Sequence, residues 1–163
     1  MGQNFPMPES RERTEEEHAP EGTQAEGPKP PPAELDERVR LALHAASEKK
    51  AHDLVVLDLR EVASFTDYFV ITSGTNVRQV QAIADAVQEQ LRKQLRVKPA
   101  RVEGYNSAEW VLLDYGDFIF HVFEEKSRRF YDLERLWRDA ARVPLPPEVA
   151  QGSGGGGSLR DER

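Results

Sequence analysis

"YFVITSGTNVRQVQAIADAV", residues 68–87, predicts a buried strand, a sharp polar turn and an amphipathic helix in direct succession. The first five residues are aromatic or β-branched, as is typical of strands. From Asn76 onward apolar residues recur at helical spacing, and Gln79 follows Asn76 by three positions, as in a capping box. Many phosphate-binding sites are also built from a strand, a turn and a helix start. The stretch is therefore either a nucleotide site or a capped turn.

The nucleotide interpretation lacks its sequence motifs. A Walker loop needs a second glycine followed by lysine, and a dinucleotide fingerprint needs three glycines, whereas Gly74 stands alone in this turn. A loose likeness remains to the Gly-Ser turn of polymerase-β-type nucleotidyltransferases, which hold two magnesium ions with paired carboxylates. Within residues 78–102 only Asp85 and Glu89 are acidic, and both lie inside the expected helix. The sequence therefore favours a capped turn, and it predicts no catalytic residue, no metal and no cofactor.

The surrounding pattern predicts an α/β fold, a single domain whose mixed β-sheet is packed with helices. Alternating or continuous apolar runs mark the strands, and apolar residues at a period of 3.6 mark the helices. Gly-Asp between two apolar runs is a two-residue hairpin signal. The expected elements are a helix at 34–51, strands at 53–59 and 68–72, a helix at 76–96, a strand at 100–105, a hairpin turning at Gly116-Asp117, and a helix at 128–143 with Phe130, Leu133, Trp137 and Ala140 inward.

Both ends of the chain differ in composition from its middle. Residues 1–33 hold seven of the eleven prolines and seven acidic residues against three basic ones, so we expect a disordered acidic tail. Residues 149–163 include a Gly/Ser run, which predicts a flexible tail of either engineered or natural origin. The folded α/β domain is expected at 34–148.

Composition narrows the classes of function. The chain has 163 residues and no cysteine, which excludes disulfides, thiol catalysis and cysteine-ligated metals. Its four histidines lack metal-ligand spacing, and no apolar run is long enough for a membrane helix. We therefore expect a soluble cytoplasmic protein. The net charge of −7 disfavours a nucleic-acid surface, so little direct nucleic-acid contact is expected; if the protein meets a nucleoprotein particle, the expected contact is a basic protein and not bare RNA.

The hairpin at 109–124 separates its side chains onto two faces, because successive strand residues point in opposite directions. One face is apolar apart from one hydroxyl and is expected in the core: Val111, Leu113, Tyr115, Phe118, Phe120 and Val122. The other mixes aromatic and polar groups: Trp110, Leu112, Asp114, Ile119, His121 and Phe123.

Two interpretations of the mixed face remain open. Large aromatic residues beside a carboxylate and an imidazole are typical of an interface that is dry in its centre and polar at its rim. Alternatively, helices cover both faces of the sheet, and Asp114 and His121 form a satisfied cross-strand pair. The basic residues Lys126, Arg128 and Arg129 follow directly and are either part of the interface or a solvated helix start.

Three stretches resemble the ribosomal silencing factor family, also called Iojap-like: "KKAHDLVVLDLREV", "SFTDYFVITSGTNVRQVQAIAD" and "VEGYNSAEWVLLDYGDFIFHVFEEKSRRFYDLERLW". The resemblance covers about residues 35–143. It implies a nucleotidyltransferase-like fold without the catalytic carboxylates, and no enzyme activity. It also implies a translation repressor that binds the large ribosomal subunit through its protein fourteen, blocks joining of the small subunit and lowers translation when nutrients are scarce. Organelle members assist large-subunit assembly, and several members form homodimers.

In this family the ribosomal contact involves the Trp-containing strand and its neighbours. Carried onto this sequence, the resemblance and the alternation of the hairpin together predict the partner-binding residues Trp110, Leu112, Asp114, His121, Phe123, Lys126, Arg128 and Arg129. Two other functions remain as alternatives: a nucleotide-binding enzyme of the nucleotidyltransferase type, and a dimeric interaction module that uses the hairpin face.

Overall fold

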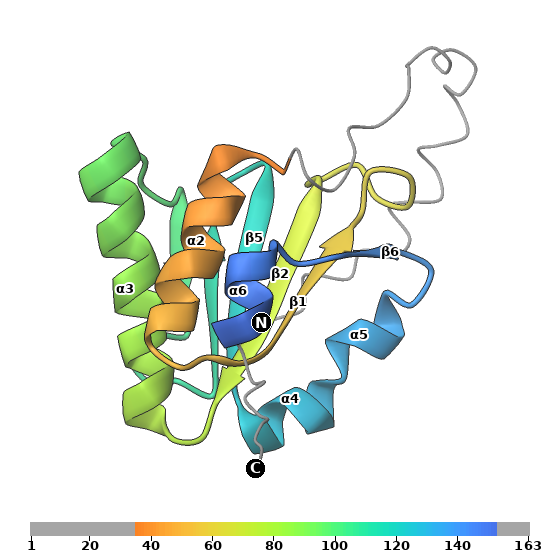
Figure 1. Ribbon diagram of the computed structural model, residues 1–163. Helices are drawn as coiled ribbons and strands as arrows, with labels where there is room; N and C mark the ends of the chain where they lie inside the picture. Colours follow the sequence, from red (N-terminus) through yellow and green to blue (C-terminus); the bar gives the residue numbers. More distant parts are fainter. Residues whose placement is uncertain (1–34, 153–163) are drawn as a thin grey trace.

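The computed structural model describes residues 35–152, which form one mixed six-stranded sheet with helices on both faces (Figure 1). The strand order is β3-β4-β5-β2-β1-β6; β2 and β5 are parallel and the other described pairs are antiparallel. This confirms the predicted α/β class. The elements are α2 (Glu37–Glu48), β1 (His52–Asp58), β2 (Tyr68–Gly74), α3 (Val77–Leu95), β3 (Arg101–Glu103), β4 (Trp110–Asp114), β5 (Phe118–Glu124), α4 (Glu125–Tyr131), α5 (Leu133–Leu136), β6 (Ala141–Val143) and α6 (Pro147–Gly152).

The turn between β2 and α3 is capped by side chains, as the sequence predicts. Asn76 Oδ1 accepts a hydrogen bond from the Gln79 backbone N–H at 2.8 Å, and Gln79 Oε1 accepts one from the Thr75 N–H at 2.8 Å. The Gln79 amide also donates to the carbonyls of Lys49 and Lys50, at 3.1 Å each. Two backbone donors that a bound phosphate would need are thus engaged within the chain, and the turn is joined to the loop after α2.

The first face of the sheet is covered by α2, α3 and α6 (Figure 1). All six hairpin residues predicted for the core lie in this layer and are buried. Helix α6 extends the fold past residue 148, because Val149 is fully buried in the same core. Residues 149–152 therefore belong to the folded part and not to the predicted C-terminal tail, whose remainder lies outside the described residues, as does the predicted tail at 1–33.

The second face of the sheet has a smaller core, which is covered by α5, Trp137 and the segment between β1 and β2. Its buried residues are Leu57, Leu59, Phe69, Ile71, Leu112, Ile119, Phe123, Leu133 and Trp137. Helix α4 also packs beside β5 on this side (Figure 1). The sheet is therefore enclosed on both faces, with long helices on one and short segments on the other.

The hairpin has the predicted register. Leu113 pairs with Phe120 and Trp110 with Phe123, and the Tyr115 N–H donates to the Phe118 carbonyl at 3.0 Å. Gly116 adopts a φ of +87°, a conformation that glycine reaches without steric cost. The turn residue therefore fixes which side chains point to each face.

The predicted C-terminal helix over 128–143 is wrong. The chain forms α4, breaks at Asp132, continues as α5, and then pairs as β6 along the free edge of β1. Asp132 has a left-handed φ of +49°, which ends the first helix and rotates the direction of the second. As a result Leu133 and Trp137 are buried as predicted, but Phe130 is 80% exposed.

Candidate functional site

The mixed face of the hairpin is not an open surface. Leu112, His121 and Phe123 are buried beneath α4, α5 and Trp137, and the imidazole of His121 is completely inaccessible. These three predicted contact residues cannot touch a partner in this structure, so the expectation of an open face is wrong for them. The alternative that both faces are covered is correct. Sequence reasoning missed the cover because its segments are too short to show a clear helical period.

Asp114 does not pair with His121. Its carboxylate accepts from the Gly116 N–H at 2.9 Å and forms an ion pair with Arg101 at 3.3 Å. The hairpin register places Asp114 opposite Ile119 and Leu112 opposite His121. Asp114 and His121 are therefore not directly opposite each other but are displaced by two residues along the ladder. The carboxylate therefore supports the turn and the edge strand β3.

Trp110 lies at the border of the buried second core and is partly exposed. Its ring centroid is 4.9 Å from that of Phe123 and 4.8 Å from that of Tyr131, and its Nε1–H donates to His121 Nδ1 at 3.0 Å. Burial lowers the pKa of His121 to about 3, so its ring is neutral near pH 7. The indole is therefore held by two aromatic rings and one directed hydrogen bond.

Two aromatic residues continue this surface outward from Trp110. Tyr131 and Phe130 are both exposed, and their ring centroids are 5.0 Å apart. We call Trp110, Tyr131 and Phe130 the aromatic ridge. The sequence prediction placed Phe130 in the core and did not single out Tyr131. Adjacent positions on a helix are about 100° apart, so two neighbouring aromatic residues cannot both face the core squarely, and this was the available signal that aromatic surface is exposed here.

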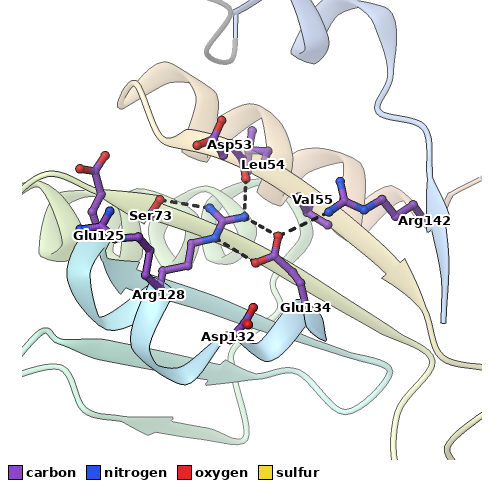
Figure 2. A pocket seen from close by; sticks show the side chains of 10 residues that line it. Asp53, Leu54, Val55, Ser73, Glu125, Arg128, Asp132, Glu134 and Arg142 are labelled. Carbon is purple, nitrogen blue, oxygen red and sulfur yellow. Dashed lines mark hydrogen bonds and ion pairs between the residues drawn. The ribbon is translucent and has the colours of Figure 1, made fainter. Parts of the chain in front are cut away.

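The three basic residues predicted as partner contacts have different surroundings. Lys126 and Arg129 are exposed on α4, beside the ridge in sequence. Arg128 points inward, and only 12% of its side-chain surface is accessible. Figure 2 shows its guanidinium directed at Ser73 and Glu134. Most of the Arg128 side chain is therefore enclosed by contacts within the chain, and its predicted contact with a partner stays a prediction.

Arg128 uses all five of its N–H donors within the chain. Nε and Nη2 donate to the two carboxylate oxygens of Glu134, at 3.2 and 3.1 Å. The remaining donors reach Ser73 Oγ and the carbonyls of His52 and Asp53, at 3.1, 3.3 and 2.9 Å. We call this set of contacts the Arg128 clamp. It joins α4 to α5 and to the ends of β1 and β2.

The clamp sits where β1 is irregular. Asp53 has a left-handed φ of +51°, and the pairing of β1 with β2 shifts between His52 and Val55. A bulge of this kind leaves carbonyl groups without ladder partners, and side chains supply donors in their place: Arg128 donates to the carbonyls of His52 and Asp53, and the Thr72 hydroxyl donates to that of His52 at 2.7 Å. A pocket of about 590 Å³ adjoins the clamp, and its lining carries both signs of charge: Asp53, Glu125, Arg128, Arg129, Asp132, Glu134 and Arg142 (Figure 2).

Comparison with known proteins identifies the family. The family model described as ribosomal silencing factor during starvation matches residues 32–157. The chain belongs to the ribosomal silencing factor family. It is 40% identical over 109 residues to the silencing factor RsfS of Halalkalibacterium halodurans, covering 67% of this chain and 92% of that protein. The RsfS of Bacillus subtilis is 40% identical over 108 residues, covering 66% and 90%. These matches confirm the resemblance stated from the sequence.

Organelle proteins and solved structures extend the likeness. The chloroplast protein Iojap of Zea mays is 35% identical over 127 residues, covering 74% of this chain and 54% of that protein. A crystal structure from Chromobacterium violaceum superposes with a TM-score of 0.60 at 37% identity, covering 63% of this chain and 84% of that one. One from Bacillus halodurans gives 0.59 at 38% identity, covering 66% and 96%. The silencing-factor fold is thus shared with experimental structures.

The silencing-factor assignment also answers the question raised by the Gly74 turn. Family membership makes the chain a non-enzymatic regulator, which confirms that prediction. The two acidic residues after the turn make contacts on the surface of α3: the Asp85 carboxylate accepts a hydrogen bond from the Tyr105 hydroxyl at 3.0 Å, and Glu89 forms an ion pair with Lys93 at 3.3 Å. Among residues 35–152 no group of side chains has a metal-binding arrangement, and none of the helices there is long and apolar enough to cross a membrane.

Proposed function

We propose that this silencing factor is a cytoplasmic translation repressor that binds the large ribosomal subunit through its protein fourteen. Bound there, it blocks the small subunit by occupying space, which requires affinity and bulk but no chemistry. Family membership supports this function. Within the fold we propose descent from the nucleotidyltransferases, because the strand, turn and helix around Gly74 are kept while the turn's backbone donors are engaged by Asn76 and Gln79.

The observation that supports a particular contact surface is the aromatic ridge. Exposed aromatic side chains with fixed rings are the residues that most often dominate the energy of protein interfaces. Phe130 is 80% exposed, and Trp110 is held in place from behind by Phe123 and His121. Lys126 and Arg129 provide a charged rim. We therefore revise the predicted site to Trp110, Tyr131 and Phe130, with these two basic residues at its edge.

Position on the molecule supports the same choice. Of the large apolar side chains that are exposed within residues 35–152, four lie on the side of α4, α5 and the segment between β1 and β2: Phe65, Phe130, Tyr131 and Leu136. Phe65 contacts Trp137 of the second core, at a centroid distance of 5.9 Å. The side covered by α2 and α3 carries two smaller exposed apolar residues, Val77 at the start of α3 and Val102 on β3, whose strand partner Leu113 lies in the first core. The exposed aromatic residues therefore gather on one side, which fits a protein that docks through that side.

The test is co-sedimentation with purified large subunits. Phe130→Ala should weaken binding about tenfold or more and reduce the block of subunit joining, because it removes an exposed anchor without opening a core. Val77→Ala is the matched control, since it truncates an exposed apolar residue on the opposite layer and should bind normally. If Phe130→Ala and Trp110→Ala both bind and block like the unchanged protein, the ridge is the wrong surface.

A homodimer through the ridge is the competing use of this surface. Light scattering of the same Phe130→Ala variant separates the two. Loss of a dimer with unchanged ribosome binding assigns the ridge to self-association, whereas an unchanged mass with lost ribosome binding assigns it to the ribosome. Crosslinking of the bound unchanged protein then identifies the ribosomal protein in contact.

A further inference from the structure

The hydrogen bond between Trp110 and His121 joins the ridge to the interior of the protein. Trp110 is opposite Phe123 across the β4–β5 ladder, and His121 is two residues before Phe123 on the same face. A long side chain reaches such a diagonal neighbour. The indole N–H donates to His121 Nδ1 at 3.0 Å, so the ring proton of the neutral imidazole is on Nε2.

The surroundings of His121 make this imidazole an unusual choice for its position. Its side chain is fully buried, and the ring of Phe69 packs edge-on against it at a centroid distance of 4.5 Å. The neighbouring face residues Leu112, Ile119 and Phe123 are apolar. Packing alone would be served by leucine, because burying an imidazole has a desolvation cost that an aliphatic side chain avoids. The directed bond to Trp110 is what the imidazole adds.

Geometry also determines what Trp110 does without that bond. The indole contacts Phe123 and Tyr131 in tilted ring pairs, and Tyr131 is itself exposed on a short helix. Aromatic contacts of this kind limit the tilt of a ring but leave it room to slide. A hydrogen bond from Nε1 to a fixed acceptor removes that freedom, because only one orientation of the indole points its N–H at Nδ1.

We infer that His121 is a positioning residue for partner binding, a buried neutral acceptor that fixes the indole of Trp110 and so presents the aromatic ridge in its binding conformation. This inference rests on the proposed use of the ridge. It explains why a fully buried side chain acts on a surface that it cannot reach. Fixing a rotamer before docking improves affinity because less side-chain freedom is lost on binding.

The experiment compares His121→Leu with His121→Asn. The two replacements have nearly the same shape, but only asparagine keeps an acceptor close to the position of Nδ1. The first readout is the indole N–H resonance of Trp110 in the free protein, assigned with Trp137→Phe. The second is affinity for purified large subunits. His121→Leu should shift the resonance to that of an indole without its bond and weaken binding about three- to tenfold, while His121→Asn restores both.

A cycle with Trp110→Phe keeps the inference falsifiable if either replacement lowers stability. Phenylalanine has no N–H, so His121→Leu should weaken binding no further in that background. Two results would overturn the positioning role. In the first, His121→Leu moves the indole resonance but leaves the affinity for large subunits unchanged. In the second, His121→Leu weakens binding by the same factor in the unchanged protein and in Trp110→Phe. If instead the ridge is not the ribosome-binding surface, Trp110→Ala would bind large subunits normally. The indole N–H resonance would still report the hydrogen bond to His121, so the two failures are distinguishable.

Discussion

Replacing Arg128 by methionine tests whether α4 is held in place by a polar clamp. Methionine keeps the length of the side chain and removes all five donors, so the Asp53 carbonyl loses the Arg128 donor, while the His52 carbonyl keeps only Thr72 Oγ1 and Glu134 keeps only the longer contact with Arg142. Arg129 is the next residue on the same helix and is exposed. Arg129→Met therefore changes the same charge without breaking an internal contact.

The magnitude follows from burial and from the number of bonds lost. Removing one partner of a fully buried ion pair costs about 3–5 kcal/mol, because the other charge is left without compensation. Here 12% of the Arg128 side chain and 24% of the Glu134 side chain remain accessible, and Arg142 also approaches Glu134, at 3.6 Å. Solvent and Arg142 compensate part of the loss, so we expect about 2–4 kcal/mol for Arg128→Met. Arg129→Met should stay within about 0.5 kcal/mol.

Urea unfolding of the two variants beside the unchanged protein measures both free energies. Co-sedimentation with large subunits, under conditions where each variant remains folded, measures their binding. The clamp predicts that Arg128→Met loses stability, while any effect of Arg129→Met is on binding. The reverse result, a stable Arg128→Met that no longer binds, would restore Arg128 as a partner contact and refute the clamp.

Two further predictions concern stability. The pKa of His121 in the folded protein, about 3, lies below its ordinary value of 6.5, so the folded state binds fewer protons than the unfolded state. The contribution of His121 to stability should be complete above pH 6.5, and the free energy of unfolding should fall by about 2 kcal/mol between pH 7 and pH 5. Urea titrations measure this slope, and His121→Leu should abolish it. Gly104 has a φ of +79°, and a Cβ there would lie 2.0 Å from the Trp110 carbonyl oxygen, so Gly104→Ala should cost about 3 kcal/mol or more. Gly116→Ala, at a φ of +87° with open space around it, should cost only about 1 kcal/mol, and equal losses would contradict the steric argument.

The parts of the fold that sequence reasoning predicted are those with local causes. The hairpin register follows from Gly116 and from strict alternation, both of which are visible within sixteen residues. The spacing of Asn76 and Gln79 predicts the capped turn after Gly74, and the absence of a phosphate-binding motif argues against a nucleotide site there. In each case the residues that decide the structure are neighbours in the sequence.

The parts that were not predictable depend on contacts between distant segments. Apolar periodicity continues across Asp132, so the break there is visible only once β1 is known to offer a free edge to residues 141–143. The direction of Arg128 depends on a bulge about 75 residues earlier. Exposure of the hairpin's second face could not be decided either, because its cover includes short segments that single-sequence patterns do not identify.

The clamp and the ridge are consequences of the same short helix. No apolar side chain of α4 is fully buried; the helix is held by the Arg128 clamp, by its connection to β5 and by Tyr131, whose ring contacts Trp110 and Phe123. Because α4 has no buried apolar face, Phe130 and Tyr131 remain exposed beside Trp110. The polar cluster inside the fold therefore makes an aromatic surface possible outside it. Weakening the clamp should consequently disorder the ridge before the main core unfolds, and hydrogen exchange in Arg128→Met would show this as faster exchange in α4 than in α3.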